Sequence, residues 1–280
     1  MNRNRMIIEA DELLEKLDKE NIQVYDATLL FFRNESDPTA YEQYLQEHIP
    51  GAAFFDHQQF SDPNSAYLLT ILPEAELAEQ IGAIGIAEDS EVILYSVGVL
   101  PAASRAWWIL HYAGHNNVRV LNGGLAAWKK AGGKIEQGAR QYEPGVYNGR
   151  FRSDAFAGKE EVQAAMENSE VGTLNTLPLE SYEAAHITGS FCLPCTDLMQ
   201  GMAAFLPDEE LALRLQEKSQ YKRIITYCGG GIAATVNAMA HLMMGHENVA
   251  VYDGSMSEWV GEGLPTEGTA EDNWEIWRQK

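Results

Sequence analysis

A cysteine followed by three consecutive glycines is the part of this sequence best suited to chemistry. Cys228 comes directly after an apolar run that ends at Tyr227, and a helical pattern begins after the glycines. Successive glycines let backbone N–H groups turn toward one point, and the first turn of the following helix adds N–H groups and the positive end of its dipole. Because such a turn stabilises an anion, we expect Cys228 to be a reactive thiolate.

A simpler interpretation of Cys228 is a buried structural cysteine beside a tight turn, because an unpaired cysteine often packs as a small apolar side chain. The glycines favour the chemical interpretation, since three in succession are entropically costly and need a reason. Both interpretations place the cysteine at the end of a buried strand.

The elements that must position Cys228 follow from short apolar runs that alternate with helical patterns. Strands are predicted over residues 22–25, 92–95, 118–121, 224–227 and 249–252, and helices over residues 73–81, 102–113 and 233–244. Such alternation predicts parallel strands covered by helices, and so the α/β class. Ligands bind at the carboxyl ends of strands in these sheets, where Cys228 lies.

The sequence contains one domain-sized pattern twice. Gly114–Trp128 and Gly245–Trp259 share seven of fifteen positions, and the HIPGA segment at His48 returns as HITGS at His186. The spacing between the copies is that of a domain rather than of a solenoid repeat, so the chain is predicted to be a tandem duplication.

We expect a first domain over residues 1–141, a connection over residues 142–157, and a second domain over residues 158–280. The connection is marked by prolines, glycines and an asparagine, which favour irregular structure. The first domain has Ser96 at the position that corresponds to Cys228, so only the second domain is expected to be catalytic.

Five segments together resemble the rhodanese family of sulfurtransferases over nearly the whole chain. They are His48–Asp56, Ala103–Trp108, Gly114–Trp128, Tyr227–Thr235 and Val251–Trp259. The resemblance implies two rhodanese folds, each a central parallel sheet flanked by helices, with a non-catalytic first copy. It implies no cofactor and no metal.

The same resemblance implies that Cys228 takes a sulfane sulfur from a donor such as thiosulfate or 3-mercaptopyruvate and becomes a persulfide. A thiophilic acceptor, cyanide or a thiol, then removes the sulfur in a ping-pong sequence. The backbone N–H cradle, carried over from the family, comprises Gly229, Gly230, Gly231, Ile232 and Ala233.

Several positions depart from the family pattern and leave the donor open. The loop Gly229–Ala234 has no charged residue, and Gly230 stands where mercaptopyruvate-specific members have serine. Gln58 lies near the expected aspartate, and Leu69 or Thr70 near the expected histidine. The Asp-x-Arg that begins each family domain is replaced in the second copy by residues 175–177, Asn-Thr-Leu.

Cys192 and Cys195 form a single Cys-Leu-Pro-Cys motif, which lacks the second pair of a zinc site. Structural packing accounts for both thiols. The functional alternative concerns Cys195, since the residue after this proline lies near the active-site loop in the family. Cys195 is then the thiol that resolves an oxidised or persulfidated Cys228 into a disulfide.

Three other features of the sequence have structural interpretations. His48 and His186 recur in both copies, including the copy without a nucleophile, which favours hydrogen-bonded turns over catalysis. Arg105 is expected to be a buried ion-pair or carbonyl partner rather than a substrate ligand. Of Trp107 and Trp108, at least one is expected to face the core between the domains.

Composition restricts the partners. The 280 residues contain 20 Lys and Arg against 41 Asp and Glu, a formal net charge of −21, which disfavours nucleic acid and anionic membranes. No apolar run is long enough to span a membrane, and three cysteines are too few for a disulfide scaffold. We expect a cytoplasmic protein with small-molecule substrates.

Two other functions remain open at this stage. A phosphatase or arsenate reductase built on a similar cysteine loop needs an arginine to grip a dianion where this chain has Ala234. A non-catalytic sulfur carrier or redox sensor fits the absence of charged substrate ligands.

Overall fold

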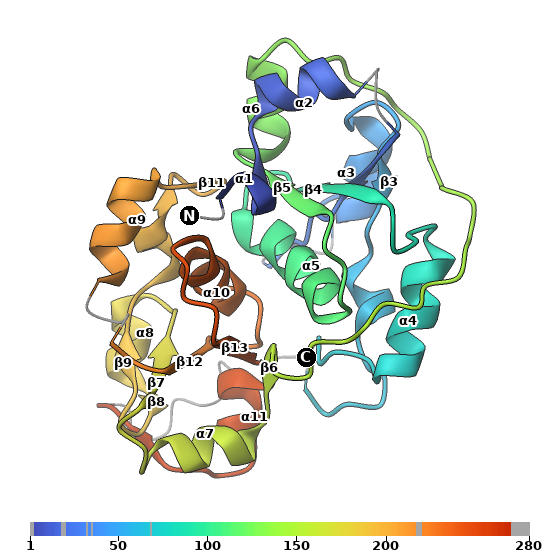
Figure 1. Cartoon of the computed structure of the whole chain (residues 1–280). Helices are drawn as coiled ribbons and strands as arrows, with labels where there is room; N and C mark the ends of the chain where they lie inside the picture. The colour runs from blue at the N-terminus through green and yellow to red at the C-terminus, as the bar shows by residue number, and fades with distance from the viewer. Residues whose placement is uncertain are drawn as a thin grey trace.

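The computed structural model describes residues 3–17, 21–31, 33–34, 36–67, 69–216 and 220–269 of the chain. Within them lie two five-stranded sheets in which neighbouring strands run parallel (Figure 1). In spatial order the first sheet comprises β1 (Ile7–Ile8), β5 (Val118–Leu121), β4 (Glu91–Tyr95), β2 (Ile22–Asp26) and β3 (Ala53–Phe54). The second has the same order, with β6 (Phe156–Ala157), β13 (Val249–Tyr252), β12 (Arg223–Tyr227), β7 (Val171–Asn175) and β9 (Phe191–Cys192).

The helices of the first half are α1 (Arg3–Met6), α2 (Ala10–Lys16), α3 (Ala40–Gln46), η1 (His57–Phe60), α4 (Glu74–Ala83), α5 (Leu100–Tyr112) and α6 (Gly124–Lys130). Those of the second half are α7 (Lys159–Ala165), α8 (Leu179–Ala184), η2 (Cys195–Leu198), α9 (Asp208–Leu215), α10 (Ala234–Met243) and α11 (Ser255–Gly261). Two short antiparallel pairs complete the second half, β10 (Met199–Gln200) with β11 (Ala204–Phe205) and β8 (His186–Ile187) with β14 (Thr266–Glu267). The predicted α/β class, with two tandem domains, is confirmed.

The predicted strands and helices all occur, with ends shifted by one or two residues. Helix α5 begins earlier than predicted because Pro101 lies in its first turn, where a missing N–H breaks no helical hydrogen bond. Helix α4 begins directly after Pro73, as predicted. No helix in the described ranges has the length and apolar character needed to span a membrane.

Alternating side chains along the strands build a separate apolar layer on each face of a sheet. In the first domain Val24 and Ile93 face α2 and α6, whereas Tyr25 and Leu94 face α4 and α5. The second domain repeats this arrangement, with α7 and α11 on one face and α9 and α10 on the other. The inner layers of the two domains join into one core, in which α5 packs against α10 (Figure 1).

The recurring histidines form the same turn in both domains. Nδ1 of His48 donates to the Tyr44 carbonyl oxygen at 2.9 Å, and Nδ1 of His186 donates to the Tyr182 carbonyl oxygen at 2.7 Å. Each histidine ring also stacks on that tyrosine ring. The prediction of a structural role for both histidines is confirmed.

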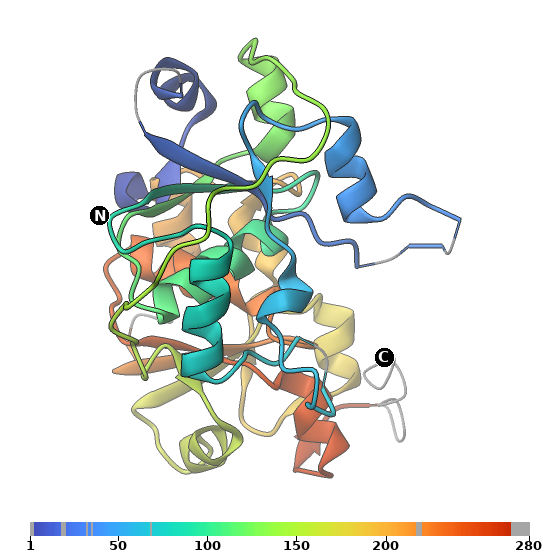
Figure 2. The ribbon, with the colours of Figure 1, turned by 90° about the vertical axis from the view of Figure 1, so that its right-hand side faces the viewer.

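The connection between the domains packs along the first domain before it reaches β6 (Figure 2). The Gly145 N–H donates to the Gly82 carbonyl oxygen at 2.8 Å, and the Tyr142 hydroxyl donates to the Gly51 carbonyl oxygen at 3.0 Å. Farther along, Nε1 of Trp108 donates to the Ala155 carbonyl oxygen at 3.2 Å. Trp108 thus lies in the core between the domains, as predicted for at least one of the paired tryptophans.

Candidate active site

Cys228 lies at the carboxyl end of β12, the central strand of the second sheet, and its side chain is buried, with 3% of the residue exposed. Tyr227, which precedes it, is in register with Asn175 at the end of β7, and Asn175 is in register with Cys192 at the end of β9. The loop that follows Cys228 leads into α10. This is the strand-to-helix position that the sequence predicted.

Four carbonyl groups of the loop have hydrogen-bond donors. The Cys228 and Gly229 carbonyl oxygens accept from the N–H groups of Met256 and Ser257, at 3.0 and 2.9 Å. The Gly231 carbonyl oxygen accepts from Nη1 of Arg105 at 3.2 Å. The carbonyl oxygen of Ile232 accepts from both the N–H and the hydroxyl of Thr235.

These bound carbonyls determine where the next N–H in the chain points. In a planar trans peptide the C=O and the N–H of the following residue point in opposite directions. Each of the four bound carbonyls therefore directs the next N–H away from its own donor, and these four N–H groups have no acceptor among the described residues. They belong to Gly229, Gly230, Ile232 and Ala233.

The N–H of Gly231 corrects the expectation of a five-residue cradle. It donates to Oγ of Ser255 at 3.0 Å, and the Cys228 N–H donates to the same oxygen at 3.1 Å. The Ser255 hydroxyl in turn donates to the Tyr252 carbonyl oxygen at 2.8 Å. Gly231 therefore shapes the loop, whereas its N–H is unavailable to a ligand.

Ser255 has a backbone φ of +48°, which a residue with a side chain adopts only with strain. The corresponding residue of the first copy is Gly124, with a φ of +56° and no side chain. The second domain therefore keeps a strained serine where glycine is the easier choice. Its hydroxyl oxygen is what the two loop N–H groups require.

The first domain carries the same turn without a nucleophile, as predicted. The Ser96 hydroxyl donates to the Val99 carbonyl oxygen at 2.5 Å. The Leu100 N–H of this loop and the Gly123 N–H of the turn after β5 donate at 2.8 and 3.0 Å to the carbonyl oxygens of Met202 and Ala203 from the second domain. A loop of the second domain thus packs against both turns of the first.

Cys195 lies near Cys228, and Cys192 is oriented differently. The Cys195 N–H donates to the Thr176 carbonyl oxygen, and the Thr176 N–H donates to the Tyr227 carbonyl oxygen, both at 2.9 Å. Burial, with the nearby Cys228, raises the pKa of Cys195 to about 12. The Cys192 thiol faces the Leu177 carbonyl oxygen at 3.7 Å. Among the residues described, no group of three or more His, Cys, Asp or Glu side chains is placed to hold a metal ion.

The first-domain segment 69–71 lies between Arg105 of its own domain and Asp253 of the second. The Leu69 carbonyl oxygen accepts from Nη2 of Arg105 at 2.9 Å, and the Ile71 N–H donates to Oδ2 of Asp253 at 2.7 Å. His57, in the same domain, donates from Nε2 to the Ala27 carbonyl oxygen at 3.0 Å.

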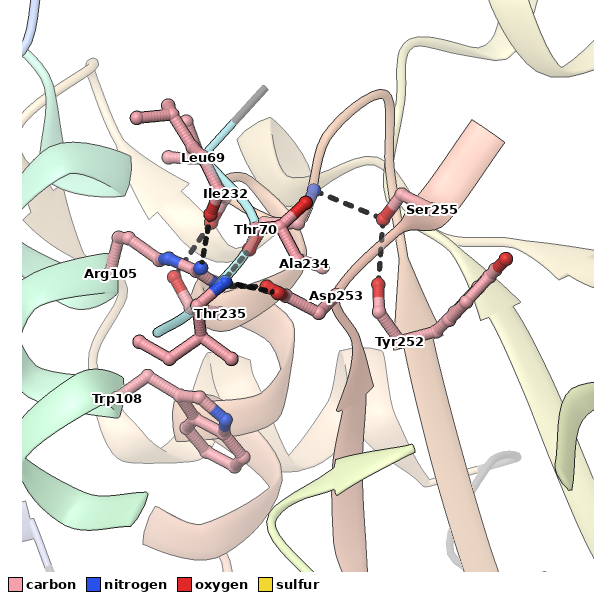
Figure 3. A network of polar contacts seen from close by, with 12 residues as sticks. Leu69, Thr70, Arg105, Trp108, Ile232, Ala234, Thr235, Tyr252, Asp253 and Ser255 are labelled. Atoms are coloured by element: carbon pink, nitrogen blue, oxygen red, sulfur yellow. Dashed lines mark hydrogen bonds and ion pairs between the residues drawn. The ribbon is translucent and has the colours of Figure 1, made fainter. Parts of the chain in front are cut away.

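Arg105 is a buried ion-pair and carbonyl partner, as predicted, and it connects the domains (Figure 3). Nη1 of Arg105 lies 2.7 Å from Oδ1 of Asp253. Sequence reasoning missed Asp253 and Ser255, although a signal was present. Both belong to Asp-Gly-Ser, where the first copy has Asn-Gly-Gly, so the two copies differ there as they differ at Cys228.

Comparisons with known proteins agree with this architecture. The model of the rhodanese-like domain matches residues 9–131 and 159–262. The chain is 33% identical over 272 residues to a 3-mercaptopyruvate sulfurtransferase of Escherichia coli (strain K12), an alignment that covers 92% of this chain and 96% of that protein. It is 30% identical over 242 residues to a thiosulfate sulfurtransferase of Cricetulus griseus, covering 81% and 82% of the two chains.

The fold comparison gives the same result. A crystal structure of SseA from Escherichia coli, described as a 3-mercaptopyruvate sulfotransferase, aligns with a TM-score of 0.79 at 30% identity, and the alignment covers 89% of this chain and 98% of that one. Both halves of the chain thus match the same domain, and full-length relatives share the tandem arrangement. The chain therefore belongs to the rhodanese family, as a sulfurtransferase built from two rhodanese-like domains in tandem.

Proposed function

We propose that this enzyme transfers sulfane sulfur through a persulfide on Cys228. The observation that carries the proposal is the set of four N–H groups directed away from the bound carbonyls of the loop that follows the thiol. Such a set stabilises negative charge on sulfur without any charged side chain. The first domain supports the assignment by contrast, because it has Ser96, and the N–H groups of Val97 and Leu100 in its loop already have acceptors.

The reaction proceeds in two displacements. The Cys228 thiolate attacks the outer sulfur of thiosulfate or the thiol sulfur of 3-mercaptopyruvate, so that an S–S bond forms and the donor's bond to that sulfur breaks. The leaving group is sulfite from thiosulfate. From 3-mercaptopyruvate it is the enolate of pyruvate, which takes up a proton. The acceptor next attacks the outer sulfur of the persulfide, which returns Cys228 to the thiolate and gives thiocyanate from cyanide or a persulfide from a thiol.

The electrostatics of the loop bear on the donor. Arg105 lies on the carbonyl side of the loop and is paired with Asp253, so its charge is already compensated. The backbone therefore supplies the stabilisation of the transferred sulfur, and no basic side chain of the loop selects for a dianion. Thiosulfate and 3-mercaptopyruvate both remain candidate donors.

We assign the domains as predicted, with residues 1–141 non-catalytic, residues 142–157 connecting and residues 158–280 catalytic. Phe156 and Ala157, at the end of that connection, pair as β6 with β13 of the second sheet. Residues 217–219 and 270–280 of the catalytic segment lie outside the described residues. The cytoplasm is the proposed location, supported by a small number of cysteines, three in the chain, that form no disulfide with one another.

Parallel assays test the proposal. Purified protein is given thiosulfate and cyanide in one assay and 3-mercaptopyruvate and a thiol in the other, and the intact mass is measured after donor alone. We expect an increase by one sulfur atom on the peptide that contains Cys228. Cys228→Ser should abolish transfer from every donor, whereas Cys192→Ser should retain it, and transfer that survives in the Cys228 variant contradicts the assignment.

A second candidate function is a redox-sensing sulfur carrier, which the deep burial of Cys228 favours. In this case the donor still loads Cys228, but neither cyanide nor a small thiol removes the sulfur catalytically. A mass increase without turnover in both assays identifies this outcome.

We propose in addition that Cys195 resolves an oxidised Cys228. Peroxide converts the Cys228 thiolate to a sulfenic acid, and the Cys195 thiolate then attacks that sulfur, so that a disulfide forms and hydroxide leaves. The raised pKa of Cys195 makes this step slow at neutral pH, because the thiolate is the attacking form.

A further inference from the structure

We propose that Arg105 of the first domain is a positioning residue for the catalytic loop of the second. Its role is to set the direction of one N–H in the sulfur-binding cradle. This inference rests on the proposed function of that loop, and it gives the first domain, which has no nucleophile, a part in catalysis.

Arg105 is enclosed between the domains, with 2% of its side chain exposed. One side of the guanidinium lies 2.7 Å from Oδ1 of Asp253 and donates to the Gly231 carbonyl oxygen at 3.2 Å. The other side donates to the Leu69 carbonyl oxygen at 2.9 Å. Figure 3 shows Arg105 reaching from α5 toward these groups, and its Cζ atom also lies 5.3 Å from the centre of the Phe156 ring.

The contact with Gly231 has a direct consequence for the site. The Gly231 carbonyl belongs to the same peptide as the Ile232 N–H, and the two point in opposite directions. By binding the carbonyl, Arg105 directs the Ile232 N–H into the cradle. Each of the other three bound carbonyls is held by a group of the second domain itself.

The backbone of Asp253 passes close to Gly231. A Cβ atom on Gly231 would lie 2.6 Å from the Asp253 carbonyl oxygen, so the loop passes this residue at a distance that only glycine allows. The φ of Gly231 is +73°, which also favours glycine. The second carboxylate oxygen of Asp253 accepts from the Ile71 N–H of the first domain at 2.7 Å.

Backbone strain collects around this network. Within the described residues, the non-glycine residues with positive φ are Leu69, at +57°, and Ser255, at +48°. Leu69 gives its carbonyl to Arg105, and Ser255 accepts the N–H of Gly231. Strained residues persist where surrounding contacts hold them, and they concentrate at functional sites.

The reciprocal contact in the first domain lacks this cation. Asn122 takes the place of Asp253, and its Oδ1 accepts from the Phe205 N–H at 2.9 Å. The two copies therefore share the hairpin contact, but only the pair that serves the catalytic loop is ionic.

The test compares Arg105→Lys and the double variant Arg105→Met/Asp253→Asn with wild type. The double variant leaves no unpaired buried charge, so it is the variant expected to fold. The control is Arg119→Met, since Arg119 is a half-buried first-domain arginine that pairs with Glu12 and Glu91 and touches no residue of the loop.

Two measurements are made on each folded variant. The first is the rate of Cys228 alkylation by iodoacetamide, followed by mass spectrometry of its peptide, which requires no sulfur transfer. The second is the separate determination of kcat and KM for transfer. Loss of one N–H from an anion-binding site lowers kcat by about 10²–10³-fold, so a misdirected N–H should lower it by about 10–100-fold with little change in KM.

We expect alkylation to slow by about tenfold in the double variant, Arg105→Lys to fall between it and wild type, and Arg119→Met to match wild type. Wild-type alkylation and wild-type kcat in Arg105→Lys and the double variant overturn the proposal, as does an equal loss in Arg119→Met. If no variant, wild type included, transfers sulfur, the proposed function fails, and the alkylation rates still decide the role of Arg105.

Discussion

Replacement of Ser255 gives the sharpest test of how the catalytic loop is held. Its hydroxyl oxygen is the acceptor for two buried N–H groups, those of Cys228 and Gly231. Ser255→Ala removes the acceptor and keeps the strained backbone. Ser255→Gly removes the acceptor too, but it reproduces the residue that the first domain has as Gly124.

The expected magnitudes follow from these contacts. A buried N–H that loses its acceptor costs about 1–3 kcal/mol, so Ser255→Ala should lower the free energy of unfolding by about 2–6 kcal/mol. Glycine relieves about 1–2 kcal/mol of left-handed strain and loses about 0.5–1 kcal/mol through the greater freedom of the unfolded chain. Ser255→Gly should therefore be more stable than Ser255→Ala by about 0.5–1 kcal/mol.

Urea unfolding followed by circular dichroism measures this order, and sulfur transfer is measured on the same samples. Both variants should lose activity, since the loop is no longer held at two of its N–H groups. The control is Ser90→Ala, whose hydroxyl oxygen accepts from the Ala87 N–H at 3.0 Å in the turn before the first residue of β4, and which should keep full activity. If Ser255→Gly is no more stable than Ser255→Ala, backbone strain at this residue does not lower the free energy of unfolding. Full activity in either variant refutes the role of the Ser255 hydroxyl in holding the catalytic loop.

Three further predictions concern the thiols and pH. Mild peroxide should give a Cys195–Cys228 cross-link detectable by mass spectrometry, and a modified Cys228 without that cross-link contradicts the resolving role. In the native protein Cys195 should react with iodoacetamide far more slowly than after unfolding, because burial and Cys228 raise its pKa to about 12. Burial lowers the pKa of His57 to about 4 and of His241 to about 3. As the pH falls below about 6.5, these histidines are protonated in the unfolded chain but not in the folded one, so the free energy of unfolding decreases. Between pH 7 and 5 the two histidines should lower the free energy of unfolding by about 4 kcal/mol. Burial raises the pKa of Asp26 to about 6, and its protonation in the folded state offsets about 1 kcal/mol of this loss. A urea midpoint that does not fall over this range contradicts the prediction.

Much of the fold follows from local sequence because its signals are local. The alternation of apolar runs and helical patterns gives the strands and the α/β class, and the repeated motifs give two domains with one strand order. The position of Cys228 follows in the same way, since a strand, a glycine run and a helix are contiguous in the chain. The roles of His48 and His186 follow from their recurrence in a copy that lacks the nucleophile.

The details of the site depend on contacts that no local pattern specifies. The sequence predicts that Arg105 is paired, but its partner Asp253 lies in the other domain, and only packing of α5 against α10 brings them together. The sequence also cannot assign a direction to each peptide of the glycine run. That direction depends on which carbonyls find donors, and for this reason Gly231 turns its N–H to Ser255 while its neighbours do not.

Cross-domain contacts connect the domain without a nucleophile to the loop that carries Cys228. Each domain extends a hairpin to the strand ends of the other, and the residue after β5 or β13 accepts an N–H from it. In the first domain the incoming carbonyls of Met202 and Ala203 accept from the N–H groups of Leu100 and Gly123. In the second domain the incoming Leu69 carbonyl accepts from Arg105 instead. Under our proposal this arginine, which also holds the Gly231 carbonyl, is what leaves the Ile232 N–H directed toward the transferred sulfur.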